Sequence, residues 1–93
     1  MSLVKNLHGT ADNYAPYGYS NWKDVYIIQH GNWPNYCCAK GCIKRATDTA
    51  HVIKVYSNDN DWYLVPVCHE HNMSSVPFEV EDYNLQKANK NKW

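Results

Sequence analysis

The chain has 93 residues, with nine basic and nine acidic side chains, so its formal net charge is zero when histidine is neutral. This length predicts one small domain with a modest core, and neutrality disfavours tight sequence-independent DNA binding, which depends on many phosphate contacts. The first ten residues lack the apolar core of a signal peptide, and the longest apolar run, residues 62–68, is too short to span a bilayer. We therefore expect a cytoplasmic protein without a membrane partner.

Residues 1–19 are expected to be irregular, because two glycines and a proline interrupt any secondary-structure period. Three tyrosines crowd this segment, and two interpretations of them are open. They form a surface that stacks on nucleic-acid bases, or they pack over a core that is too small to cover itself. We favour packing for these residues, which are Tyr14, Tyr17 and Tyr19.

Residues 20–29 predict the best helix of the first half of the chain. Ser20 is a suitable N-cap, and Gly31 follows where a left-handed backbone often ends a helix. Helical spacing gives an apolar stripe, which is more often core than binding surface, and its members are Trp22, Val25 and Tyr26.

Cysteine and histidine form two close pairs further along the chain. Gly41, directly before Cys42, allows the sharp turn of a zinc knuckle that begins at Cys37. Cys68 and His71 are three residues apart, so one turn of helix places both side chains on one face. Thiolate and imidazole donors in two pairs suit tetrahedral Zn(II), and binding would close a long loop and contribute directly to folding.

The first pair leaves one choice open, because Cys37 and Cys38 both have usual zinc spacings to Cys42. Neighbouring side chains diverge, so one metal ion cannot easily take both. We predict Cys37 as the ligand and Cys38 as a buried thiol. Two disulfides in a secreted domain are the alternative for the four cysteines, disfavoured by the missing signal peptide and the Cys-x2-His spacing.

Residues 51–56 and 62–68 are rich in β-branched and aromatic side chains, and the polar segment between them predicts a hairpin. If the strands pair tightly from this turn, His51 lies opposite Val67. His51 is then next to Cys68 and the start of the following helix.

The segment 68–75 predicts a short helix, with Cys68 and His71 on one face and His69 exposed on another. Alternating apolar and acidic residues predict a short strand at 78–80. Residues 84–93 are polar and lysine-rich, and we expect a flexible tail. The chain is therefore predicted to be a single domain, residues 1–93, with a zinc core at 37–75.

The order of knuckle, hairpin and helix resembles the treble-clef zinc finger, and in particular the HNH (ββα-metal, His-Me finger) nuclease finger. The resemblance covers residues 37–75. It rests on the cysteine pair, on Ala50-His51-Val52, on the run Val65–Cys68, and on Cys68-x2-His71-Asn72. It implies an α+β fold, a small zinc-stapled treble clef, here with an added N-terminal helix.

The same resemblance implies catalytic roles. His51 matches the general base that activates water, and Asn72 matches a helix ligand for a catalytic Mg(II) or Mn(II) ion. Ala50 stands where the family usually has a metal-binding Asp or His, which leaves Asn72 as the one matched ligand; whether Asp48 reaches the site stays open. The competing interpretations are a structural histidine at His51 and a helix residue bonded to local backbone at Asn72.

Two functions from different classes follow. The first is a metal-dependent endonuclease or nucleic-acid-binding finger, with DNA or RNA as partner and little activity in the isolated chain. The second is a non-catalytic zinc-stapled interaction module with a protein partner that the sequence does not identify. The first requires His51 and Asn72 to lie side by side. Phosphate contacts would come from a local basic group, otherwise a solvated face: Lys40, Lys44 and Arg45.

Overall fold

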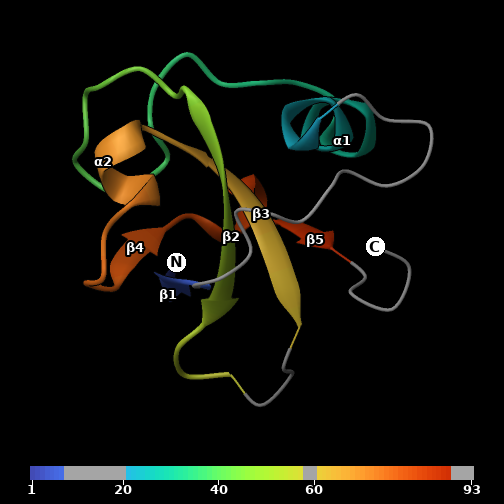
Figure 1. The fold of residues 1–93 in the computed structure, drawn as a ribbon. Coiled ribbons are helices and arrows are strands. Elements are labelled where there is room, and N and C mark those ends of the chain that lie inside the picture. The colour runs from blue at the N-terminus through green and yellow to red at the C-terminus, as the bar shows by residue number, and fades with distance from the viewer. Residues whose placement is uncertain (8–20, 58–60, 89–93) are drawn as a thin grey trace.

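The computed structural model describes residues 1–7, 21–57 and 61–88, and one five-stranded sheet organises them (Figure 1). The spatial order is β4-β1-β2-β3-β5, and every neighbouring pair is antiparallel. The strands are β1 (Ser2–Asn6), β2 (Asp48–Lys54), β3 (Trp62–Val67), β4 (Phe78–Val80) and β5 (Gln86–Ala88). The helices are α1 (Trp22–His30), α2 (His69–Asn72) and the 3-10 turn η1 (Asp82–Asn84). These elements confirm the α+β class.

Side chains alternate across the sheet, so the β2–β3 hairpin has two buried faces. Ala50 and its partner Val65 belong to a core that includes Cys37 and Cys68. Leu64 on the opposite face packs with α1, and His51, which pairs with Leu64, contacts the same helix. Figure 1 shows α1 and α2 on either side of this hairpin. The sheet therefore separates the α1 core from the cysteine core.

Helix α1 ends as predicted but is capped by a different residue. Gly31 has φ 105°, and its backbone N–H donates to the Ile27 carbonyl at 2.9 Å. The N-cap is Asn21 rather than Ser20, because the Asn21 side chain accepts from the Asp24 N–H at 2.9 Å. Ser20 lies outside the described residues.

The prediction that residues 1–19 are irregular is wrong for 2–6, which form β1. This strand lies inside the sheet, where Val4 pairs with Lys54 on one side and with Phe78 on the other. Both partners are far away in sequence, so local composition did not reveal the strand. The three tyrosines of this segment lie outside the described residues.

The predicted hairpin forms with a different register. His51 pairs with Leu64, and the residue opposite Val67 is Asp48 instead of the predicted His51. The reason is that β2 ends at Lys54, which makes the connection to β3 longer than the predicted turn at 57–61. The hairpin therefore brings Asp48, rather than His51, level with the start of α2.

The C-terminal part of the described chain contains one confirmed strand and two differences. The strand predicted at 78–80 is β4. Helix α2 is a single turn, His69–Asn72, with Cys68 at the N-cap position, instead of a helix over 68–75. The predicted tail at 84–93 is ordered where it is described, because residues 86–88 form β5 against β3 and bury Ala88. No described helix has the length and apolar character needed to cross a membrane.

Candidate metal centre

Four side chains bring their donor atoms together on the cysteine-core face of the hairpin. The donor atoms of Cys37, Cys42, Cys68 and His71 all lie within 4.8 Å of one another. The Sγ atoms of Cys42 and Cys68 are 3.9 Å apart, and His71 Nδ1 is 3.2 Å from Cys68 Sγ and 3.6 Å from Cys37 Sγ. A tetrahedral Zn(II) with Zn–S bonds of ~2.3 Å separates its sulfur ligands by about 3.8 Å. The cluster therefore has dimensions that can bind a metal ion of this kind.

The knuckle supplies two of the four donors. Its backbone closes through the Cys37 N–H to the Lys44 carbonyl at 2.8 Å and the Cys42 N–H to the Ala39 carbonyl at 3.0 Å. Gly41 has φ 79°, a left-handed conformation that residues with a Cβ rarely adopt. The glycine identified in the sequence therefore makes the turn that brings Cys42 back towards Cys37.

The start of α2 supplies the other two donors. Cys68 has an extended backbone at the N-cap position, and its carbonyl accepts from the Asn72 N–H at 3.0 Å. One helical turn then places His71 over Cys68, as the three-residue spacing predicts. His69 is exposed, also as predicted.

Cys38 is outside the cluster, in agreement with the choice of Cys37 over its neighbour. The Cys38 side chain is half-buried, and burial raises the pKa of its thiol to about 11, so it stays protonated at neutral pH. Burial also raises the pKa of Cys37, to about 12. A bound cation would compensate the charge of a Cys37 thiolate, whereas Cys38 belongs to no group of metal donors within the described part of the chain.

Cys68 differs from Cys37 although both belong to the cluster. Burial alone would raise the pKa of the Cys68 thiol, but hydrogen bonds to its sulfur, beginning with those from His71, outweigh it and bring the pKa to about 7. The negative charge of the cluster is therefore most easily formed at Cys68. The Cys68 sulfur lies between the knuckle, through Cys42, and α2, through His71.

His51 and Asn72 do not lie side by side, in contrast to the arrangement that we expected. His51 lies on the α1 face of β2, where its ring meets the edge of Trp22 at a centroid distance of 4.5 Å. Only 8% of it is exposed, Nε2 has no hydrogen-bond partner among the residues that the structure describes, and burial lowers its pKa to about 4. Asn72 is on the cysteine-core side, where its Nδ2 donates to Asp48 Oδ2 at 3.0 Å. The three-residue change in register explains the separation, and the catalytic roles stay predictions.

Asp48 and Ala50 have clearer roles than the sequence allowed. Asp48 does reach Asn72, and His69 Nδ1 is 2.8 Å from the same carboxylate oxygen. Burial would raise the Asp48 pKa, but hydrogen bonds from His69 and then Asn72 outweigh it and lower the pKa. Ala50, at the position of the missing family ligand, is fully buried in the core beside Cys37 and Cys68. A charged ligand at position 50 would be placed in that core.

The three basic residues beside the knuckle each have a partner within the chain. Lys40 is 3.6 Å from Glu79, and Lys44 forms an ion pair with Glu70. The Arg45 guanidinium lies 5.5 Å from the ring centroid of Tyr36. A phosphate would have to compete with these contacts, so the structure adds no support for the predicted phosphate site.

One residue of this region was missed altogether in the sequence. Asn6, at the end of β1, donates from Nδ2 to the carbonyls of His71 and Ser74 at 2.7 and 2.9 Å. It is 65 residues from His71 in sequence, and no sequence motif predicts the contact.

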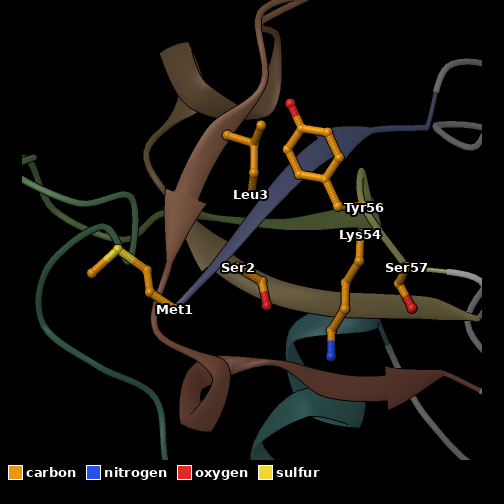
Figure 2. Close-up of a pocket in the computed structure, with 6 residues that line it drawn as sticks. All are labelled: Met1, Ser2, Leu3, Lys54, Tyr56 and Ser57. Atoms are coloured by element: carbon orange, nitrogen blue, oxygen red, sulfur yellow. The ribbon is translucent and has the colours of Figure 1, made fainter.

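A pocket lies elsewhere, along β1 and the end of β2 (Figure 2). Its volume is about 170 Å³, which is below the ~300 Å³ at which ordinary ligand pockets begin. None of the four clustered donors lines it. The lining residues are Met1, Ser2, Leu3, Lys54, Tyr56 and Ser57.

Comparison with protein-family models, curated proteins and solved structures finds no significant match to this chain. The resemblance to the HNH nuclease finger therefore stays a prediction from the motif. The strongest indication of function is therefore the geometry of the four donor side chains.

Proposed function

We propose that this protein is a zinc-stapled domain in which one Zn(II) ion has a structural role. The observation that carries the proposal is the convergence of four donor atoms within 4.8 Å, from Cys37, Cys42, Cys68 and His71. Three thiolates and one imidazole favour Zn(II) over Mg(II) or Mn(II), which prefer oxygen ligands. Four protein ligands also complete a tetrahedron, whereas catalytic zinc sites keep one position for water or substrate.

We further propose a non-catalytic interaction module in preference to an HNH-type endonuclease. The separation of His51 from Asn72 across the sheet supports this choice, because a general base and its metal must reach the same phosphate. The buried Ala50 also supports it. The exposed apolar residues Ile43 and Met73, 86% and 68% exposed, closely follow ligands in the sequence and would suit contact with a protein partner.

The zinc proposal is tested by metal analysis of the folded protein purified without added metal. We expect one zinc per chain in the wild type and loss of stoichiometric zinc in Cys68→Ala. Folded wild-type protein with far less than one equivalent of zinc would contradict the structural role.

The choice between module and nuclease is tested by nicking of supercoiled plasmid with added Mg(II) or Mn(II). Wild type, His51→Ala and Asn72→Ala are compared at equal zinc loading, and we expect no cleavage above the protein-free control. Cleavage by the wild type that both substitutions abolish would establish the endonuclease instead.

A further inference from the structure

Helix α2 carries a metal-site donor although it is too short to be stable by itself. It has four residues, and the backbone bonds that close it are few: the Asn72 N–H donates to the Cys68 carbonyl, the Met73 N–H to that of His69 and the Ser74 N–H to that of His71. His71 belongs to this single turn, so its position depends on contacts made by the rest of the fold. The clearest of these contacts comes from the other end of the chain.

Asn6 provides that contact through a side-chain amide directed at the end of α2. Both acceptors of its Nδ2 group are backbone carbonyls, that of His71 and that of Ser74. The opposite amide orientation would bring oxygen against two carbonyl oxygens, so the donor orientation is the favourable one. Among the described residues the Oδ1 atom is buried without a hydrogen-bond partner, which is unfavourable for a polar acceptor. The arrangement thus keeps the two donors at the expense of an unpaired acceptor.

The strand that carries Asn6 is a firm support. β1 lies between β4 and β2, and Asn6 pairs with Val52 while Val4 on the same face is fully buried. The pairing with β4 ends at Val4, so the backbone at Asn6 is held by β2, where the next N–H, that of Leu7, donates to the His51 carbonyl at 2.8 Å. A side chain on a strand fixed in this way has little freedom to move away from its acceptors. The two hydrogen bonds of Asn6 therefore fix the position of α2 relative to the sheet.

We propose that Asn6 is a positioning residue of the metal centre. Its two hydrogen bonds hold the C-terminal end of α2 so that His71 Nδ1, rather than water, completes the ligand sphere. Asp48 holds the same helix through the side chains of His69 and Asn72, but this contact is more exposed and therefore weaker. The inference rests on the proposed metal site and adds a residue that controls how tightly the site keeps its ion.

Cobalt substitution tests the proposal, because the visible d–d bands of Co(II) report whether the fourth ligand is nitrogen or water. Asn6→Leu removes both donors at similar volume, and His71→Ala gives the reference spectrum without imidazole. We expect Asn6→Leu to keep the thiolate charge-transfer bands while its d–d bands move towards those of His71→Ala. Zinc transfer to a chromophoric chelator should be at least tenfold faster than in the wild type.

Gln86→Leu is the matched control. Gln86 is also a half-buried amide with a long-range contact, at 3.3 Å to His30 Nδ1, but it lies on the edge strand β5. The Gln86→Leu variant should have the cobalt spectrum and the rate of zinc release of the wild type, even if its melting temperature is lower. Should Asn6→Leu not fold, Asn6→Ser, with one hydroxyl donor, is measured for an intermediate release rate.

The outcomes are distinguishable. A wild type that takes up Co(II) without the spectrum of three sulfurs and one nitrogen would contradict the metal site itself. A wild type with that spectrum, and Asn6 variants that share its bands and release rate, would overturn the role of Asn6 alone.

Discussion

Cys37 and Cys38 are adjacent cysteines that the fold uses differently. The donor atom of Cys37 belongs to the metal cluster, whereas Cys38 packs against the same core from outside the cluster. The two spacings to Cys42 could not separate them in the sequence, because both are usual for zinc. What separates them is the direction of the side chain, which the backbone of the knuckle determines.

We therefore predict that Cys37→Ser and Cys38→Ser have very different effects. Cys37→Ser should lose stoichiometric zinc and the cooperative unfolding transition, because structural zinc supplies on the order of 10 kcal/mol of folding free energy in small domains. Cys38→Ser should keep one zinc and lose about 1–2 kcal/mol through a buried hydroxyl. Zinc content and urea unfolding measure both effects. Equal zinc loss in the two variants would place Cys38 in the site.

His51 is a buried histidine whose charge the fold opposes. Its pKa is about 4 in the folded protein because of burial, against an ordinary value of about 6.5 when unfolded. Between these values the unfolded chain binds more protons, so stability rises with pH across the window and is lost as pH falls from about 6.5 towards 4. The contact with Trp22, and the lack of a described hydrogen-bond partner for Nε2, are consistent with a neutral ring.

The prediction is a pH-dependent difference between the wild type and His51→Phe. From pH 7 to pH 5 the wild type should lose about 2 kcal/mol more unfolding free energy than the variant, which has no group to titrate there. Acid also weakens zinc binding, but His51 is no ligand, so that contribution cancels in the comparison. Urea titrations at the two pH values measure the difference. Equal losses in both proteins would contradict a neutral buried His51.

At the scale of elements, local signals predicted α1, the hairpin, the start of α2 and β4. They missed β1 and β5, which are short strands without a distinctive sequence pattern. These strands form by pairing with the edges of β2 and β3, which are distant in sequence. The register of the hairpin was missed for a related reason, since Val55 and Tyr56 favour a strand but belong to the turn. Elements that depend on tertiary pairing could not be derived from local propensity.

Strand β5 supplies a test, because we expected a flexible tail there. Ala88 is buried against α1 and β3, while its neighbour Lys87 is exposed and pairs with Asp61 at 3.1 Å. Ala88→Asp should lower the free energy of unfolding by about 3 kcal/mol or more, because a buried charge has no partner there. Lys87→Ala should cost less than about 1 kcal/mol. Denaturant unfolding of both variants measures this, and similar small losses would show that the segment is a tail.

At the scale of the whole molecule, the metal cluster joins two segments that the hairpin separates. The knuckle contributes Cys37 and Cys42 before β2, and the turn after β3 contributes Cys68 and His71. Each pair was readable in the sequence because its spacing is local. The supports of the site were not, since Asn6 and Asp48 reach α2 across 65 and 24 residues.

Removal of the metal should therefore unfold the domain as a unit. The cysteines lie within the same core as Val4, Val52 and Val80, so free thiols would weaken packing across the sheet as well as at the knuckle. We expect excess chelator to lower the melting temperature by at least about 20 °C, as loss of several kcal/mol does in a domain of this size. Circular dichroism melts measure it, with zinc-saturated chelator as the control. An unchanged melt would mean that the sheet is stable without the ion.

The place of β1 inside the sheet has a consequence for synthesis on the ribosome. Val4 pairs with Lys54 and with Phe78, so one side of β1 has no partner until residue 78 has been made. At cellular rates of elongation, that partner is made about 4 to 15 s after β1. During this time the nascent chain presents an open strand edge of the kind that pairs with other chains. A chain that stopped before β4 would keep that edge, and it would be a substrate for chaperones or a nucleus for aggregation.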